Sequence, residues 1–412
     1  MSILFNLKHF LFIILYEIKH IFLFINALLQ YKKLDLTLKL AYLDFKINYI
    51  YNSHKNYDVL KIFLKRFFFS AEFKNKINFV SYLDKIKIKN NDLLIKKINQ
   101  LPIRKSIIFL KNLLYYYQLF GCLESCLTIR KIYRKKLINL QKKDTLINLD
   151  ALRACLEINR PDLVLNFYKN KKCKYFNKKK ALEIFKFANL LKKKYIYKIN
   201  KKNYFNKLVS DKNILIQGPI TESYKKNLFT SKEFVHISMN AMGEKRNYNS
   251  ISYYNGTSVS NFSNKIINAY PNILFTCFKT KEGTRLILNK YYKKKTRIFF
   301  NVNNILLNKY GANHTQNIIY DLLLYNPKKI FLTGINFFLK KKYYKNYKSN
   351  FFSKKKLIYA MRIHDPFSNF LFIQNLFKRG FICASAKVQR ILNLKDKTYA
   401  KKMNNQYRQF IL

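Results

Sequence analysis

The sequence predicts an α/β protein, in which an all-α helical region precedes a Rossmann-like, mostly parallel β-sheet with helices on both faces. Up to about residue 200, apolar residues recur three and four positions apart, which is typical of amphipathic helices. Seven short apolar runs follow between residues 213 and 386, and continuous apolar runs are typical of strands buried on both faces. Helical patterns separate several of these runs, as in sheets built from strand–helix–strand units.

We therefore divide the chain by this change of pattern. Residues 1–200 are the predicted helical region, with helical-hairpin repeats as one arrangement that fits, 210–395 are the predicted α/β domain, and 396–412 are a basic C-terminal tail. A chain of 412 residues is long enough for two domains and a large core.

The composition is that of a folded, very basic protein. Lys and Arg number 80 against 21 Asp and Glu, the net charge is +59, and 49% of residues are hydrophobic. Such a charge favours nucleic-acid binding, and an anionic membrane leaflet is an equally good partner. However, the lysines are spread along the whole chain, and Lys, Asn, Ile, Phe and Tyr are abundant while Trp is absent. Because this is the bias of an A+T-rich genome, we expect a generally charged surface and no specific nucleic-acid groove.

The most apolar stretch of the helical region is FLFIILYEIKHIFLFINALL, residues 10–29. Glu17, Lys19 and His20 lie near its middle, where charge is costly in a membrane span. No small-residue cleavage site follows, so a signal peptide is not predicted. We expect a helix that is buried or lies on a membrane surface, and a transmembrane span is the less favoured alternative.

Two stretches of the helical region, 113–136 and 148–171, resemble each other. Each predicts a helix, a short break at Gly121 or Asn159, and a second helix. Stacked hairpins of tetratricopeptide type would make a partner-binding or packing module, and an irregular helical bundle fits equally well. The six cysteines form no CxxC pair, so we expect reduced core cysteines.

In the second half of the chain, apolar runs predict strands and two stretches predict helices. The strands are predicted at 213–220, 234–241, 250–258, 272–280, 297–304, 329–338 and 381–386, and the clearest helices at 314–327 and 366–380. In parallel sheets, ligands bind outside the carboxyl ends of the strands. Polar side chains at these ends are therefore the candidate ligand-binding residues.

Four strands end in polar groups. The first runs into Gln217, Gly218 and Pro219, the second ends at Asn240 and the third at Asn255. A glycine allows backbone amides to approach a ligand, although Gly-Pro and Asn-Gly are also ordinary turn signals. The fourth strand, in KKIFLTGINFFLKKKYYKNYKSN (328–350), changes after one glycine from apolar residues to Tyr and Lys. That change marks either a polar connection or a phosphate-binding loop.

His364 is the best single candidate for chemistry. It precedes Asp365, a predicted helix cap, and Pro366, a predicted first helical residue. The positive end of a helix dipole favours neutral imidazole, which is the form that a general base needs. His314 also opens a helix and competes for this role, and either histidine could instead be structural. The chain has no Asp-x-Asp, GxxxxGK[ST], GxGxxG or GxSxG motif, which disfavours metal-clamped sugar-nucleotide, nucleoside-triphosphate, dinucleotide and serine-hydrolase chemistry.

Residues 210–390 resemble the bacterial sialyltransferases (glycosyltransferase family 42). IQGPITES resembles the Gly-Asn-Gly-Pro-Ser loop of that family, FVHISMNAM a strand ending in a nucleotide-binding asparagine, and ISYYNGTS a Tyr-Asn-Pro-Ser segment. KKIFLTGINFF is similar to Lys-Glu-Ile-Tyr-Leu-Ser-Gly-Ile-Asp-Phe-Tyr, and NHT at 313–315 takes the place of Thr-Ser-Gly. The order and spacing of five short matches carry the resemblance.

The resemblance implies transfer of a nonulosonic acid (a sialic-acid-like sugar) from a cytidine monophosphate (CMP)-activated donor to a glycan acceptor, with inversion and without metal or other cofactor. The implied catalytic residues are His364, as general base, and Tyr344 with Tyr343, at the leaving phosphate. The implied nucleotide-binding residues are Gln217, Gly218, Pro219, Asn240, Asn255, Asn313, His314, Thr315, Gly334 and Asn336. Phe338 stands where the family has a first leaving-group tyrosine, Asn336 replaces an aspartate and Gly311 an arginine. A lysine of 340–342 could substitute for the missing hydroxyl.

We therefore expect a glycosyltransferase acting on a cell-surface glycan, which can be lipid-linked, in the cytoplasm at the periphery of the inner membrane. A homo-oligomer is compatible with the sequence. The alternatives are a non-catalytic scaffold of surface-polysaccharide assembly with a decayed transferase domain and, less favoured, an RNA-binding protein, which the charge and the aromatic residues suggest.

Overall fold

The computed structural model of the chain describes residues 99–100, parts of 102–118, and 123–143, 148–170, 178–193, 204–218, 233–239, 250–254, 273–279, 296–307, 313–339 and 364–411. Contacts divide the chain into two compact units, with the boundary after Lys136. Helix α7 (Leu123–Lys143) runs across this boundary. In the first unit, the Sγ of Cys126 donates a hydrogen bond to the carbonyl of Leu114 at 3.6 Å.

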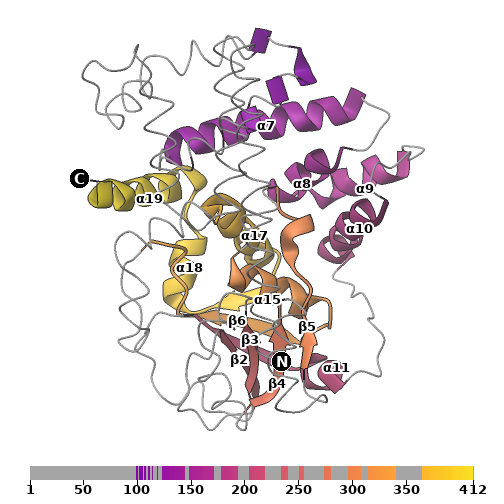
Figure 1. Cartoon of the computed structure of the whole chain (residues 1–412), viewed down its shortest axis with the longest axis vertical. Coiled ribbons are helices and arrows are strands. Elements are labelled where there is room, and N and C mark those ends of the chain that lie inside the picture. The colour runs from indigo at the N-terminus through magenta and orange to yellow at the C-terminus, as the bar shows by residue number, and fades with distance from the viewer. Residues whose placement is uncertain are drawn as a thin grey trace, which may run out of the picture. The chain divides into compact units, whose positions relative to one another are not determined.

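The second unit contains a parallel β-sheet (Figure 1). Among the described residues, seven strands pair in the order β5-β4-β3-β2-β1-β6-β7, and all pairs are parallel. The strands are β1 (Asn213–Gln217), β2 (Phe234–Met239), β3 (Ser250–Tyr254), β4 (Ile273–Phe278), β5 (Thr296–Ile298), β6 (Lys329–Thr333) and β7 (Ile382–Ala384). A strand lies in each of the seven predicted runs and the parallel α/β class is confirmed, but β6 ends at Thr333 and the predicted strand residues 334–338 form a turn.

The first strand lies at the centre of the sheet. Ile214, Leu215 and Ile216 are all buried, so both faces of β1 are covered, as its continuous apolar run predicts. β1 pairs with β2 on one side and β6 on the other. The chain leaves β1 towards β2 but leaves β6 towards β7, so the carboxyl ends of β1 and β6 form the topological switch point of the sheet.

The fifth strand is shorter than predicted. The apolar run 297–304 forms β5 only to Ile298, and a 3-10 helix, η5 (Val302–Asn304), follows. The backbone N–H of Phe300 donates to Oδ1 of Asp321 at 2.8 Å instead of to a neighbouring strand. The side chain of Asn301 accepts from the N–H of Asn303 at 3.2 Å and so starts the 3-10 turn.

The two clearest predicted helices are present as α15 (His314–Leu323) and α17 (Pro366–Lys378). Asn313 caps α15 through its side chain. Asp365 caps α17 by accepting from the N–H groups of Phe367 and Ser368, and proline occupies the first helical position, as predicted.

The helical residues before the sheet pack within the same unit. Helices α8 (Leu149–Glu157) and α9 (Pro161–Asn170) form a hairpin whose break is at Asn159, with φ of 60°, as the sequence predicts. Helices α8 and α10 (Lys178–Lys193) are joined to the sheet domain by contacts with α17 and η5 (Figure 1). Helix α11 (Tyr204–Val209) directly precedes β1. The tetratricopeptide-like assignment stays a prediction, because the break at Gly121 lies outside the described residues.

The C-terminal stretch that we treat as a basic tail contains a packed helix. After α18 (Ala386–Leu392), α19 (Asp396–Ile411) buries Tyr399, Ala400 and Met403. The ring of Tyr399 stacks on Phe370 of α17, with centroids 4.0 Å apart. In the described part of the chain, no helix has the length and apolarity to cross a membrane. The apolar stretch 10–29 lies outside that part.

Candidate functional site

The N-terminus of α15 lies at the carboxyl ends of β2 and β3. Nε2 of His314 is 2.9 Å from the carbonyl oxygen of Tyr253, near the end of β3. The hydroxyl of Thr315 donates to Sδ of Met239, the last residue of β2, at 3.7 Å. The first turn of α15 is therefore held at the edge of the sheet where parallel folds bind ligands.

Asn369 joins this N-terminus to that of α17. Its side-chain oxygen accepts from the backbone N–H of Asn313 at 2.9 Å, and its carbonyl accepts from Nε2 of Gln316 at 3.1 Å. Its amide group also donates to the carbonyl of Asp365 at 2.6 Å. Asn369 is buried, and our sequence reasoning missed it. No local pattern in the sequence marked it, because its partners Asn313 and Gln316 lie 56 and 53 residues away.

His314 is neutral and has one defined tautomer. A carbonyl only accepts hydrogen bonds, so Nε2 of His314 carries the proton and Nδ1 is an acceptor. Nδ1 is buried and has no hydrogen-bond partner in the part of the chain that the structure describes. Burial lowers the pKa of His314 to about 4, and its electrostatic interactions with Lys279 and His364 act in the same direction. Lys279 and His364 are therefore within electrostatic range of His314.

His364 lies immediately before the cap of α17. It is half-buried, whereas the neighbouring Asp365 is fully buried and accepts from the N–H groups of Phe367 and Ser368 at 3.0 and 3.1 Å. The capping interactions fix the backbone next to His364. An imidazole at such a position can accept a proton from a bound hydroxyl.

Lys279 is a second residue that the sequence reasoning missed. It follows β4, and its backbone N–H donates to the carbonyl of Tyr254 at 3.1 Å. Its side chain is half-buried, and burial lowers its pKa. No carboxylate among the described residues forms an ion pair with it. The signal in the sequence was weak, because Lys279 is one of many lysines that follow an apolar run.

Two glycines meet at the switch point. The N–H of Gly218 donates to the carbonyl of Thr333 at 2.7 Å. A Cβ on Gly218 would overlap the carbonyl oxygen of Gly334 and the side chain of Ile335. The close approach of the two strand ends therefore requires glycine at 218, and its N–H is already used within the sheet.

The turn after β6 has an unusual backbone. Gly334, Phe337 and Phe338 have φ of 64°, 49° and 64°, and for a non-glycine residue this left-handed region costs about 1–2 kcal/mol. The side chain of Asn336 accepts from the N–H of Phe338 at 3.1 Å, and the hydroxyl of Tyr399 donates to the carbonyl of Phe337 at 2.9 Å. Asn336 and the C-terminal helix thus hold the turn in this conformation.

The predicted site residues fall into three sets, of which the structure describes two. Asn313, His314, Thr315 and His364 belong to the joined N-termini of α15 and α17. Gln217, Gly218, Gly334 and Asn336 lie at the carboxyl ends of β1 and β6. Pro219, Asn240, Asn255, Tyr343 and Tyr344 lie outside the described residues.

A buried polar network supports this edge of the sheet. Asp321 of α15 is fully buried and accepts from the hydroxyl of Tyr253 at 2.7 Å, and it forms an ion pair with Arg297. The guanidinium of Arg297 lies 3.8 Å from the ring centroid of Phe205. Burial raises the pKa of Asp321, and Arg297 opposes that shift. The carbonyl of Tyr253 also orients the ring of His314. The network therefore holds both Tyr253 and His314 in place.

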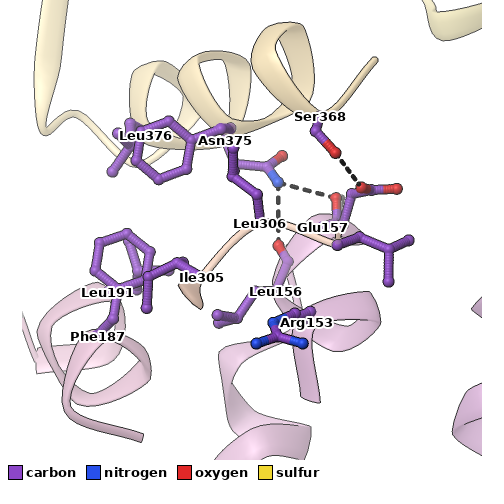
Figure 2. Close-up of a pocket in the computed structure, with 12 residues that line it drawn as sticks. Arg153, Leu156, Glu157, Phe187, Leu191, Ile305, Leu306, Ser368, Asn375 and Leu376 are labelled. Carbon is purple, nitrogen blue, oxygen red and sulfur yellow. Dashed lines mark hydrogen bonds between the residues drawn. The ribbon is translucent and has the colours of Figure 1, made fainter. Parts of the chain in front are cut away.

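A small cavity lies between α17 and the helices α8 and α10 (Figure 2). Its volume of about 30 Å³ is enough for one or two water molecules and too small for a nucleotide. At its border, Nδ2 of Asn375 donates to the carbonyls of Leu156 and Glu157 at 3.2 and 3.0 Å, and the hydroxyl of Ser368 is 3.4 Å from the carboxylate of Glu157. These contacts hold α17, and therefore the residues at its N-terminus, against the helical layer.

Within the described ranges, no group of three or more His, Cys, Asp or Glu residues is arranged to hold a metal ion. No protein-family model, curated protein or solved structure matches the chain.

Proposed function

We propose that the protein is a glycosyltransferase that transfers a nonulosonic acid from a CMP-activated donor to a cell-surface glycan, with inversion and without metal. One observation carries the proposal. The N-termini of α15 and α17 are joined at the carboxyl edge of a parallel sheet, and they hold His314 and His364 near each other. This is the edge at which such sheets bind ligands, and it coincides with the residues that resemble the sialyltransferases.

In this reaction His364 is the general base. The acceptor hydroxyl attacks the anomeric carbon, the bond between that carbon and the phosphate oxygen breaks, and CMP leaves with the electron pair. His364 takes the proton of the attacking hydroxyl, a contribution worth about 10²–10⁴-fold in rate. The cap at Asp365 holds the backbone beside His364, so that the imidazole needs little reorganisation.

The nucleotide binds at the first turn of α15. Helix N-termini present free N–H groups and a positive dipole to phosphate, and Asn313, His314 and Thr315 lie there. Nδ1 of His314 is an acceptor and suits a hydroxyl or amino group of the nucleoside rather than a phosphate oxygen. The further contacts in this proposal are Gln217, Gly218, Pro219, Asn240, Asn255, Gly334 and Asn336.

Tyr344 and Tyr343 donate hydrogen bonds to the departing phosphate. Phe338 has no hydroxyl, and its backbone is held in the turn by Asn336. A cationic side chain is therefore needed in addition to the tyrosines. The enzyme acts at the cytoplasmic face of the inner membrane, where its lysine-rich surface is attracted to anionic lipid and to lipid-linked acceptors.

The proposal is tested by hydrolysis of a panel of CMP-activated sugars in the presence of a chelator. We expect release of CMP from at least one nine-carbon acidic sugar and none from sugars activated by uridine diphosphate. If no CMP-activated sugar is cleaved and CMP does not bind, the transferase proposal is wrong. Binding of CMP without any turnover would favour a scaffold with a decayed transferase domain.

A further inference from the structure

We propose that Lys279, together with the N-terminus of α15, forms the phosphate-binding subsite of the protein. That this phosphate belongs to a cytidine nucleotide rests on the proposed function. The subsite itself is inferred from the position of Lys279 and from two absences among the described residues: no carboxylate pairs with Lys279, and no acceptor pairs with the N–H groups of Thr315 and Gln316.

The register of the sheet places Lys279 next to the first turn of α15. Tyr253 of β3 pairs with Cys277 of β4, and the side chain of Tyr253 reaches Asp321 of α15. Cys277 therefore lies on that same face of the sheet, and Lys279 directly follows β4, with its N–H bonded to the carbonyl of Tyr254 at 3.1 Å. Lys279 is two residues nearer the carboxyl edge, where Nε2 of His314 meets the carbonyl of Tyr253.

The ammonium of Lys279 is partly removed from water without an acidic partner. Its side chain is half-buried, and it forms no ion pair with any carboxylate that the structure describes. Its electrostatic neighbour is neutral His314. Partly buried charges are normally paired, so an anion at this place would relieve an electrostatic cost that the protein alone leaves uncompensated.

The first turn of α15 supplies the other half of the subsite. The N–H of His314 is satisfied by the side chain of Asn313 at 2.7 Å. The N–H groups of Thr315 and Gln316 have no hydrogen-bond partner among the described residues, although both residues are buried. Orphan N–H groups at a helix start favour a bound anion. Lys279 and these two amides therefore offer a phosphate both charge and directed donors.

This subsite also explains how charge on a leaving phosphate can be stabilised when residue 338 is phenylalanine. A preorganised ammonium in a partly dry site stabilises developing negative charge more strongly than one in water. Lys279 directly follows β4 and its N–H is bonded to the carbonyl of Tyr254, so its backbone does not depend on the loop after β6. The ammonium of Lys279 stabilises the leaving phosphate by donating hydrogen bonds, and it does not have to transfer a proton.

The test is calorimetric titration of the full chain with CMP, cytidine and inorganic phosphate, in wild type, Lys279→Gln and Lys329→Gln. Lys329 is an exposed lysine at the opposite, amino end of the sheet and is the matched control for a lost positive charge. We expect Lys279→Gln to weaken CMP binding by about 10–100-fold, as for loss of one charge-assisted hydrogen bond. Its affinity for cytidine and its far-ultraviolet circular dichroism should not change, and Lys329→Gln should bind all three ligands as wild type does.

The outcomes separate this inference from the proposed function. Equal CMP affinity in wild type and Lys279→Gln overturns the role of Lys279 while the transferase proposal stands. If inorganic phosphate binds, depends on Lys279 and is not competed by CMP, the subsite stands and the cytidine assignment fails. If neither phosphate nor CMP binds wild type, the subsite itself is refuted.

Discussion

The buried ion pair between Asp321 and Arg297 offers the sharpest test of how the sheet edge is held. Asp321 has no exposed surface and accepts from the hydroxyl of Tyr253, the N–H of Phe300 and the guanidinium of Arg297. In Asp321→Asn the shape is kept, but the carboxylate charge is lost and an amide N–H₂ faces at least one other donor. The guanidinium of Arg297, with 11% of its side chain exposed, is left without its counter-charge.

Removing one partner of a buried pair typically costs about 3–5 kcal/mol, and we expect a loss in this range. Against a total stability of about 5–15 kcal/mol, such a loss brings the domain near unfolding at room temperature. The chain contains no Trp, so urea unfolding is best followed by far-ultraviolet circular dichroism. The urea midpoint should fall by about 1 M or more.

Two controls make the result specific. Asp162 forms an exposed ion pair with Arg160, and Asp162→Asn should shift the midpoint little because water screens that pair. In a double-mutant cycle, Arg297→Met should reduce the cost of Asp321→Asn, since the uncompensated charge is then gone. If Asp321→Asn lowers stability by less than about 1 kcal/mol, or if the two substitutions are additive, our account of this network is wrong.

Two further predictions concern the strand ends and pH. Gly218→Ala should destabilise by about 2–3 kcal/mol, because its Cβ meets the backbone of Gly334. In the control, Gly380→Ala, the new Cβ has open space and only the φ of 74° is unfavourable, at about 1 kcal/mol. An equal or smaller loss at 218 would contradict the close approach of the strand ends. His314 has a pKa of about 4 in the folded protein and about 6.5 when unfolded, so its contribution is complete above pH 6.5 and is lost as the pH falls towards 4. The loss amounts to about 3 kcal/mol. As the pH falls from 6.5 to 4, the urea midpoint of wild type should therefore fall more than that of His314→Gln. If the two midpoints change in parallel, His314 is not buried as described.

The fold class was predictable because burial on both faces leaves a direct mark in the sequence. The runs around Ile214 and Ile330 are continuously apolar, and both residues are fully buried in neighbouring central strands. The start of α17 was predictable for a local reason, because Asp365 and Pro366 together are a cap and a first helical residue. The end of β5 was not predictable, because the N–H of Phe300 bonds to Asp321, which lies 21 residues later.

The site residues that the sequence did not reveal also depend on contacts between residues that are far apart in the chain. Asn369 reaches Asn313 across 56 residues, and no local pattern marks an asparagine that will bond to the cap residue of another helix. Lys279 differs from the other lysines only through the register of β3 and β4, which places it beside His314. The docking of α8 on α17 depends on Asn375, which bonds to carbonyls more than 200 residues earlier. The periodicity of apolar residues predicts which segments are helices or strands. It does not predict which helices and strands become neighbours, and these contacts depend on that.

The central claim is that a sheet edge carrying His314 and His364 performs base-assisted transfer from a CMP-activated sugar. The most direct measurement is CMP release from the best activated sugar by wild type and by His364→Ala, in chelator, with CMP affinity measured on the same preparations. We predict that the variant loses at least about 10²-fold in turnover and binds CMP as tightly as wild type. Full turnover by His364→Ala, or no CMP release by the wild-type protein from any donor, would contradict the account.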